Sequence, residues 1–327
     1  MDSLKDIGEL GIIQMMERAL GTSHRAVVSF GDDVSAVRFR GGNIAVLKTD
    51  MLVGSTDLPP CMTLRQAAWK AVVACVSDLA AKGVRPLAGL VALGLPRSLK
   101  QSDVQQIARG LAEAAKAYNF PIVGGDTNES QDLTISIALF AVTTRGKLVL
   151  RTGARAGDLV AVTGEFGSTS AALRAVLETK RRPSSLQRDL YRALYRPRAR
   201  LDLGLRLAAS GTVTSSIDSS DGLAWSLHQL SELNNLGVVL ENVPISKAAI
   251  DFATRNRLRP IDLALYGGEE YELVVTVNPK DFVRAFKAVK SRLKQIGYVT
   301  KEFRGVRIRC GQSMIPVKKK GWEHFRD

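Results

Sequence analysis

The sequence predicts a protein of the α/β (α+β) class, with two domains that hold mixed sheets flanked by helices. Its 327 residues exceed the usual length of one domain, and 45% hydrophobic with 24% charged residues is typical of a globular protein. Apolar runs of strand length alternate with segments of helix length. Residues 146–157 are rich in glycine and charge, so we place there the boundary between domains 1–150 and 151–327.

The first domain is expected to contain five strands and three helices. An amphipathic helix covers Leu4–Leu20. A second helix begins after Thr63, a typical N-cap residue, and ends at Gly83, a typical helix stop. The turn Gly41-Gly42-Asn43 predicts a hairpin. The remaining expected elements are the strands Val34–Phe39, Ile44–Leu47, Pro86–Leu95, Phe120–Val123 and Leu133–Thr143, and the helix Ser102–Asn119 with Ser102 as its cap.

The second domain begins with a strand followed by a glycine-rich turn, Gly164–Ser170, and a helix through Glu178. That turn either binds an anion at the helix N-terminus or only connects strand to helix, and the sequence favours neither reading. A second turn, Tyr266–Glu272, enters a strand. The remaining expected elements are the strands Leu159–Thr163, Val213–Ile217 and Leu273–Val277, and the helices Ala199–Ala209 and Leu223–Leu233.

The net charge of +14 arises mainly in two basic segments, Lys180–Arg200 and Lys318–Lys320. Neither matches a nucleic-acid-binding signature, and we interpret the first as a solvated basic helix. No apolar run approaches the ~18 residues of a membrane span. Cys61, Cys75 and Cys310 form neither a disulfide framework nor a zinc motif. With a polar N-terminus unlike a signal peptide, these features predict a cytoplasmic protein without nucleic-acid or membrane partners.

One helix carries an unusual charge. The segment that begins after Thr63 is apolar or small nearly all round, which predicts that it is buried. Asp78 nevertheless lies on its stripe of alanines (Ala67, Ala71, Ala74 and Ala81). A lone buried carboxylate costs several kcal/mol unless it is paired or binds a metal ion. The helix alone leaves open whether Asp78 caps a loop, pairs with an arginine or coordinates a metal.

Four further motifs deliver aspartates to small-residue loops at the ends of apolar strands. Aspartates gathered in one place repel one another unless cations neutralise them. Oxygen ligands without a His/Cys cluster favour Mg²⁺ or Mn²⁺ over zinc, and Mg²⁺ usually completes its coordination with water and substrate phosphates. The sequence contains neither a P-loop nor a kinase-type glycine loop. We therefore expect several magnesium ions and a phosphate-rich reaction at the motifs of Asp32/Asp33, Asp50, Asp126 and Asp218/Asp221.

The motifs together identify a family. The segments GDDVSAV, KTD, SDLAAKG, GGDTNES, LRTGARAGD, TGEFGSTSAAL, IDSSDGL, GGEEYEL and KGWEHF resemble thiamine-monophosphate kinases, in order from Gly31 to Phe325. That resemblance implies a two-domain PurM-like architecture of the aminoimidazole-ribonucleotide synthetase superfamily, with an N-terminal domain that forms a homodimer. It also implies the activity of the family, which transfers the ATP γ-phosphoryl group to thiamine monophosphate in the last step of thiamine diphosphate biosynthesis.

The resemblance further implies roles for individual residues. The implied ligands of Mg²⁺ include Asp78, which would be shared between several ions; the full set is Asp33, Thr49, Asp50, Asp78, Asp126, Asp218 and Asp221. ATP would contact Gly125, Asp126, Arg151 and Ser220, and the thiamine substrate would contact Asp57, Glu269 and Trp322. Two positions depart from the pattern: Lys48 stands where the family often has Ser or Thr, and Asp57 stands where some relatives have His.

The chemistry implied by the family needs no general base. The attacking group is a phosphate oxygen whose second pKa is about 6, so it is largely ionised at neutral pH. The obstacle is repulsion between two polyanions, which metal ions and an in-line arrangement overcome. Two alternatives stay open: another ATP-dependent enzyme of the superfamily (an amidine-forming cyclo-ligase or a selenophosphate synthetase), and a basic nucleic-acid-binding protein. Trp322 is either a face for the thiazolium cation or an anchor for the C-terminal segment.

Overall fold

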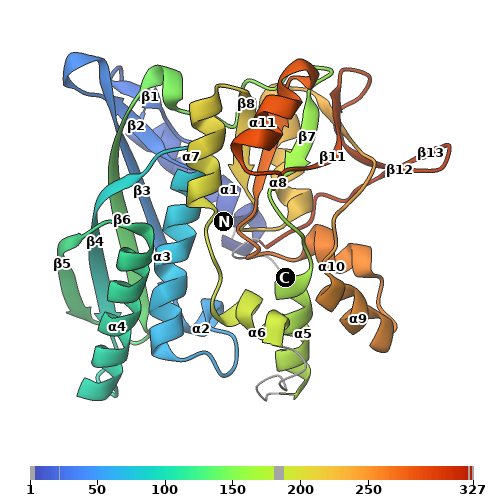
Figure 1. Ribbon diagram of the computed structural model, residues 1–327. Helices are drawn as coiled ribbons and strands as arrows, with labels where there is room; N and C mark the ends of the chain where they lie inside the picture. The colour runs from blue at the N-terminus through green and yellow to red at the C-terminus, as the bar shows by residue number, and fades with distance from the viewer. Residues whose placement is uncertain (1–3, 22, 180–187, 323–324, 326–327) are drawn as a thin grey trace.

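The computed structural model describes residues 4–21, 23–179, 188–322 and 325. Two mixed sheets lie side by side with helices between and around them, which confirms the predicted α/β (α+β) architecture (Figure 1). The first sheet has the strand order β1-β2-β3-β6-β4-β5; β4 and β5 pair in parallel and the other neighbours are antiparallel. Its strands are β1 (Ala26–Val28), β2 (Ser35–Arg38), β3 (Asn43–Val53), β4 (Pro86–Leu95), β5 (Ile122–Glu129) and β6 (Thr134–Thr144).

The second sheet has the order β13-β12-β9-β11-β7-β10-β8. The strands β9 and β12 are parallel, and all other neighbouring strands in it are antiparallel. Its strands are β7 (Leu159–Val162), β8 (Val213–Asp218), β9 (Gly237–Leu240), β10 (Leu273–Val277), β11 (Lys294–Thr300), β12 (Gly305–Cys310) and β13 (Ser313–Pro316).

The helices divide between the two sheets. In the part of the chain that the structure describes, no helix has both the length and the apolar character needed to cross a membrane. The helices of the first half of the chain are α1 (Leu4–Leu20), α2 (Gly54–Asp57), α3 (Leu64–Ala81) and α4 (Gln101–Tyr118). In the second half they are α5 (Ser168–Thr179), α6 (Arg188–Tyr195), α7 (Leu201–Ser210), α8 (Leu223–Asn234), α9 (Lys247–Arg255), α10 (Pro260–Tyr266) and α11 (Phe282–Ala288).

Helix α3 lies between the two sheets, with β3 and β6 as neighbours in the first half and α7 and β8 in the second (Figure 1). Thr63 caps it through a reciprocal capping box with Gln66, and Gly83 follows its end with φ +66°, as predicted. A Cβ on Gly204 of α7 would lie only 1.9 Å from the Ala80 carbonyl oxygen. The small residues of α3 and α7 therefore serve close helix packing.

One buried core runs through both halves of the chain, and it includes Leu79 of α3, Leu207 of α7 and Leu273 of β10. The domain boundary near residue 150 lies between β6 and β7 and stays a prediction. Burial of hydrophobic side chains on both sides of α3 fixes the helix relative to each sheet. Residues carried by α3 are consequently held at a defined place in the middle of the molecule.

Three predicted element boundaries were wrong. Strand β3 continues through Asp50 to Val53, because it pairs residue by residue with β6 along its whole length. Strand β5 includes Asp126 instead of ending before it, since it pairs with β4 to Glu129. Helix α4 begins at Gln101, and Lys100, not Ser102, is its N-cap residue. Asp50 and Asp126 therefore lie within strands instead of in loops.

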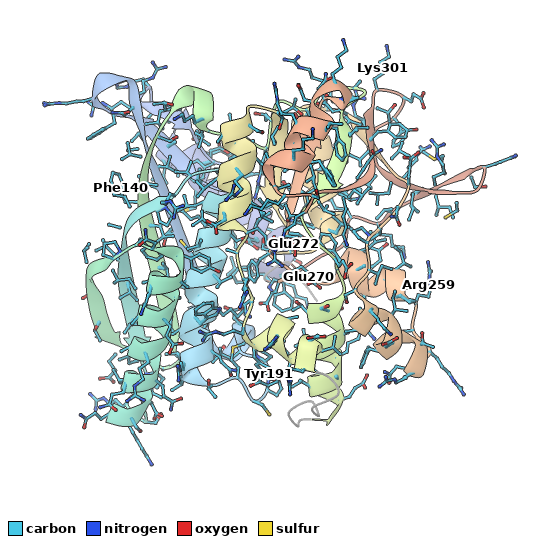
Figure 2. All side chains as sticks on the ribbon, in the orientation of Figure 1. Phe140, Tyr191, Arg259, Glu270, Glu272 and Lys301 are labelled. Atoms are coloured by element: carbon cyan, nitrogen blue, oxygen red, sulfur yellow. The ribbon has the colours of Figure 1, made fainter. Side chains whose placement is uncertain are left out.

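The first sheet has one face that the helices leave uncovered. Three residues in the middle of β3 that point away from α3 are exposed: Leu47 (46%), Thr49 and Met51 (63%). Leu90 of β4 and Val142 of β6 are exposed as well. Phe140, which pairs with Leu47 across the strands, lies in the first sheet, on the left of Figure 2. This row of apolar side chains forms a broad open surface.

Candidate active site

Three carboxylates from distant parts of the chain meet at one end of α3. Asp33 precedes β2, Asp78 lies on the last turn of α3, and Asp218 ends β8. One carboxylate oxygen of each lies within 4.8 Å of the others, and all three residues are buried. Ionised carboxylates at this separation repel unless a cation neutralises them, and an all-oxygen set fits a hard divalent ion such as Mg²⁺. This acidic triad is the centre of the candidate site.

Lys82 and Arg151 form ion pairs with Asp33. Lys82 follows the last residue of α3 and is completely buried. Its Nζ atom lies 2.7 Å from a carboxylate oxygen of Asp33 and 2.7 Å from one of Asp32, and it donates a 2.8 Å hydrogen bond to the Ser216 carbonyl. Arg151 donates through Nε to Asp33 at 2.7 Å. Burial alone would raise the pKa of Asp33, but Arg151 and Lys82 hold it below its usual value. Asp33 is therefore ionised at neutral pH.

Asp78 has a different partner. The Nζ atom of Lys48, on β3, lies 2.7 Å from the Asp78 carboxylate and 3.3 Å from that of Asp50. Burial raises the pKa of Asp78 well above its usual value, although Lys48 opposes this, and the nearby Asp218 adds to the rise. Burial would lower the pKa of Lys48, but Asp78 and Asp50 outweigh it and raise that pKa. Lys48 stays protonated between its two carboxylates.

Asp218 and Asp221 have pKa values near neutrality. Burial, followed by the charge of Asp33, raises the pKa of Asp218 to about 6, while a hydrogen bond from Ser77 opposes the rise. Burial, followed by the charge of Asp218, raises the pKa of Asp221 to about 7. A bound cation would favour the ionised form of both. Crowded carboxylates with raised pKa values are typical of functional sites.

Two predicted metal ligands lie on the other face of the sheet. Lys48 and Asp50 face α3, so Thr49 between them faces the exposed side. Asp126 shares that side, because it stands in one cross-strand row with Met51. Asp126 is on β5 and Thr49 is on β3, three strands away in the sheet. Three strand spacings of about 4.8 Å amount to about 14 Å. Within one chain, Thr49 and Asp126 do not join the acidic triad.

The predicted substrate residues Asp57 and Glu269 are joined by a buried lysine. Lys70 of α3 forms an ion pair with Glu269 and donates a 2.9 Å hydrogen bond to the carbonyl oxygen of Asp57. The Asp57 carboxylate accepts a 2.7 Å hydrogen bond from the backbone N–H of Val53. Glu269 has φ +63°, so its turn holds a backbone conformation that few side chains adopt. The two residues thus face one region from opposite halves of the chain.

The C-terminal segment reaches the same region. The backbone N–H of Trp322 donates a 3.0 Å hydrogen bond to the Asp221 carbonyl, and the Trp322 side chain is 53% exposed. The backbone N–H of Glu269 donates to the carbonyl of Ser220. The loop of Ser220 and Asp221 therefore connects the acidic triad with Glu269 and Trp322. Glu323 and His324 of the KGWEHF motif lie outside the described residues.

Gly125 has a steric reason to be glycine. A Cβ at this position would lie 1.7 Å from the Val91 carbonyl oxygen in the adjacent strand. The close approach of β4 and β5 consequently requires glycine, whatever the residue does with a nucleotide. Gly125 precedes Asp126 on the exposed edge strand β5. Of the residues predicted to contact ATP, Arg151 lies directly against the acidic triad.

Sequence reasoning missed three residues of the site: Ser77, Lys70 and Lys82. Ser77 donates a 2.6 Å hydrogen bond to Asp218. Lys70 could have been noticed, because a lysine within a helix that is apolar all round must find a partner. Lys82 gave no such signal, since a basic residue at the end of a helix normally complements the helix dipole in solvent. Only the fold shows that Lys82 is buried against Asp32 and Asp33.

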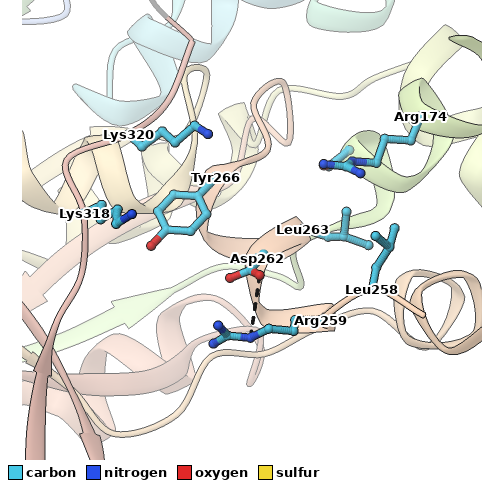
Figure 3. Close-up of a pocket in the computed structure, with 9 residues that line it drawn as sticks. Arg174, Leu258, Arg259, Asp262, Leu263, Tyr266, Lys318 and Lys320 are labelled. Atoms are coloured by element: carbon cyan, nitrogen blue, oxygen red, sulfur yellow. Dashed lines mark ion pairs between the residues drawn. The ribbon is translucent and has the colours of Figure 1, made fainter. Parts of the chain in front are cut away.

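A cavity of about 530 Å³ lies between α5, α10 and the segment before Trp322 (Figure 3). Its basic side chains are Arg174, Arg259, Lys318 and Lys320; Arg259 pairs with Asp262 at 3.6 Å. None of the residues predicted to bind metal, ATP or substrate lines it. The basic Lys318–Lys320 segment therefore contributes to a cationic cavity separate from the acidic triad.

The first basic segment, Lys180–Arg200, is described from residue 188 onward. Its helix α6 buries Leu190 and Leu194 and leaves Arg188 exposed. Tyr191 accepts a 3.0 Å hydrogen bond from Gln66 of α3. In its described part, this segment is an amphipathic helix packed beside α3, with its apolar side buried.

Comparisons with known proteins agree on one relationship. The model of the AIR synthase related protein, N-terminal domain, matches residues 31–144. The thiamine-monophosphate kinase of Nitrosopumilus maritimus (strain SCM1) is 36% identical over 99% of this chain and 100% of its own length. That of Pyrococcus abyssi (strain GE5 / Orsay) is 35% identical over 91% of each chain.

Solved structures show the same similarity at the level of the fold. The structure of AaThiL complexed with AMPPCP and TMP superposes with a TM-score of 0.87, at 29% identity over 99% of both chains. The crystal structure of a HypE–HypF complex superposes with a TM-score of 0.76 at 21% identity, over 95% of this chain and 99% of that chain. The second likeness shows the shared fold alone.

Proposed function

The chain belongs to the thiamine-monophosphate kinase family, and from this membership we propose that it transfers the γ-phosphoryl group of ATP to thiamine monophosphate, forming ADP and thiamine diphosphate. Similarity along almost the whole chain, together with a buried acidic triad at the junction of the two halves, supports this function most directly. A relative of the same fold was solved with AMPPCP and TMP bound.

We infer that Mg²⁺ is the metal. Asp33, Asp78 and Asp218 would hold it, with Asp50 and Asp221 beside them. When bound, magnesium would neutralise the charge of the phosphates and align the attacking and leaving oxygens. A hard oxygen set without histidine or cysteine suits this ion.

The protein itself contributes fixed positive charge and orientation. Arg151 is held by four hydrogen bonds: its backbone N–H donates to Asp32 at 2.9 Å, Nε and Nη2 donate to Asp33, and Nη1 donates to the Gly31 carbonyl. Its guanidinium therefore contributes a fixed positive charge beside the acidic triad. Ionised Asp33 depends in turn on Lys82. No residue is assigned as general base, because a phosphate oxygen of the substrate is already ionised at neutral pH. Direct in-line transfer without a phosphoenzyme fits this arrangement.

Asp57, Glu269 and Trp322 are proposed to receive the thiamine part of the substrate. Trp322 is 53% exposed, and an indole ring suits contact with the thiazolium cation, worth roughly 0.5–2 kcal/mol. Glu269 carries a negative charge that Lys70 partly balances. The backbone hydrogen bond from Trp322 to the Asp221 carbonyl supports this role, because it holds Trp322 beside the loop that follows Asp218.

We further propose that the protein is a homodimer that pairs through the open face of the first sheet. Leu47, Met51 and Leu90 make this face apolar, and large exposed apolar surfaces mark association sites. Thr49 and Asp126 lie on the same face, so their predicted roles would require a second copy to cover it. Analytical ultracentrifugation of the protein and of Met51→Glu tests the interface; a dimeric variant would contradict it.

The cytoplasmic location stays a prediction from the sequence.

Phosphorus NMR tests the reaction itself. The purified protein is incubated with ATP, Mg²⁺ and thiamine monophosphate, beside controls with thiamine and with an aminoimidazole-pathway substrate. Appearance of ADP and thiamine diphosphate with the monophosphate alone is the expected result. Loss of ATP without thiamine diphosphate would move the function to another branch of the superfamily. Absence of ATP turnover under all conditions would contradict an ATP-dependent enzyme.

A further inference from the structure

Lys48 occupies a position that a metal ion could otherwise take. Its Nζ atom bridges carboxylates of two elements, Asp78 on α3 at 2.7 Å and Asp50 on β3 at 3.3 Å. Its side chain is 18% exposed, so the ammonium group lies inside the site instead of at its edge. The alternation of β3 directs Lys48 and Asp50 to the same side, which fixes the ammonium beside the acidic triad.

The surrounding charges show what the ammonium does. Six carboxylates are gathered at this end of α3, whereas the described residues that pair with them supply three cations. Two of these, Lys82 and Arg151, both serve the pair Asp32 and Asp33. Lys48 is therefore the protein's own counter-charge for the remaining carboxylates; the six are Asp32, Asp33, Asp50, Asp78, Asp218 and Asp221.

We propose that Lys48 is a built-in cation that replaces one divalent ion between Asp50 and Asp78. The proposal rests on the metal-dependent function proposed above and specifies how many ions its site takes. An Mg²⁺ ion needs carboxylate oxygens at about 2.0–2.1 Å. A lysine nitrogen already within hydrogen-bonding distance of both carboxylates fills the space between them. Lys48 contacts Oδ2 of Asp78, and a carboxylate has two oxygens, so Asp78 can pair with Lys48 and also belong to the triad with Asp33 and Asp218.

A tethered ammonium also excludes a further divalent ion by charge. Two like charges a few ångströms apart repel each other, and the repulsion is stronger inside a protein than at its surface. Unlike a bound ion, Lys48 is present at every magnesium concentration. Part of the site is thereby neutralised and ordered before any metal binds. The chain then binds one divalent ion fewer than it would without Lys48.

Counting bound ions tests this proposal. Mn²⁺ is titrated into the protein, without and with AMPPCP, and free Mn²⁺ is measured by electron paramagnetic resonance. Lys48→Met should bind one more Mn²⁺ per chain than the unchanged protein, whereas Lys48→Arg should bind the same number. Lys294→Met is the matched control, because it removes the same charge from a surface pair with Glu165. An equal count in Lys48→Met and the unchanged protein would overturn the proposal.

A second measurement needs no neutral variant and so does not depend on its folding. In the ¹⁵N-labelled protein, the Nζ signal of Lys48 is assigned by its loss in Lys48→Arg. The signal should persist at saturating Mg²⁺, because the ammonium keeps its place between the carboxylates. Its shift to the position of solvent-exposed lysines would show that an ion displaces Lys48, and would overturn the proposal. Failure to phosphorylate thiamine monophosphate would instead contradict the proposed function and leave the ion count unchanged.

Discussion

Ser77 on α3 donates a hydrogen bond of 2.6 Å to the carboxylate of Asp218 at the end of β8, and both residues are buried. The bond connects positions 141 residues apart and links the helix of the first half to the sheet of the second. It holds Asp218 beside Asp78, the next residue of α3. The geometry of the acidic triad therefore depends on how α3 packs between the two sheets.

Replacing Ser77 by alanine should destabilise the protein and loosen the triad. A hydrogen bond to a charged group is worth about 1.5–3 kcal/mol, and both Ser77 and Asp218 are buried. We expect a loss of this size in the free energy of urea unfolding measured with EDTA at pH 8, where Asp218 is ionised. Ser168→Ala, which removes a neutral 2.7 Å bond to Ser246, should cost about 1 kcal/mol. Equal losses in both variants would contradict a special role of Ser77.

Asp78→Asn should nearly abolish turnover while leaving the fold intact. The substitution keeps the shape of the side chain but removes the charge that Asp33, Asp218 and Lys48 surround. Loss of a central metal ligand weakens transition-state stabilisation by several kcal/mol, a fall of roughly a thousandfold in kcat. Thiamine diphosphate formation and circular dichroism measure the two effects. Asp202→Asn at the surface is the control, and near-native activity of Asp78→Asn would remove Asp78 from the metal site.

The sequence predicted the buried charge of Asp78 because a polar residue in an otherwise apolar helix has few explanations. It also predicted α3, whose cap and stop are local signals. It could not predict that Lys48 and Lys82 face the carboxylates, since each pairs with residues far away in the chain. In a sequence, a lysine that the fold buries cannot be distinguished from a surface lysine, because the difference lies in how its helix or strand packs.

The strand boundaries near the site failed for a related reason. Polar residues such as Lys48 and Asp50 interrupt the apolar run of β3 and indicate its end. The backbone nevertheless continues to pair with β6, and its polar side chains face the acidic triad instead of solvent. A strand that carries site residues breaks the apolar pattern by which strands are recognised. The opposite orientation of Thr49 follows from this pairing and was invisible in the sequence.

Glu270 should make the stability of the metal-free protein depend on pH. Burial raises its pKa to about 7, with the charge of Glu272 adding to the effect and a 3.0 Å hydrogen bond from the Thr169 N–H opposing it. Both glutamates lie near the centre of Figure 2. The folded protein keeps the proton that the unfolded chain loses above about pH 4.5. The contribution of Glu270 to stability is therefore highest below that pH, falls as pH rises towards 7, and then levels off.

Glu270→Gln should flatten this dependence, because glutamine keeps the neutral form at every pH. The difference in unfolding free energy between the variant and the unchanged protein should grow by at most about 1.4 kcal/mol per pH unit between pH 5 and 7. Urea titrations at pH 5, 6, 7 and 8 with EDTA measure it. Glu113→Gln is the control, since its arginine partners lower the pKa of that half-buried group. Parallel pH profiles of Glu270→Gln and the unchanged protein would disprove the assignment.

Trp322→Ala should weaken binding of the thiamine substrate more than binding of ATP. The ring is half-exposed, so its removal takes away a face for the thiazolium cation while the backbone bond to Asp221 remains possible. A contact of roughly 0.5–2 kcal/mol predicts a 2- to 30-fold rise in KM for thiamine monophosphate, with KM for ATP changing less than twofold. Trp322→Phe should keep part of the affinity, because it retains an aromatic face. Steady-state kinetics with each substrate varied in turn, together with thermal unfolding, separates the two roles left open by the sequence. If Trp322 instead only anchors the C-terminal segment, the alanine variant will raise both KM values together and lower the melting temperature.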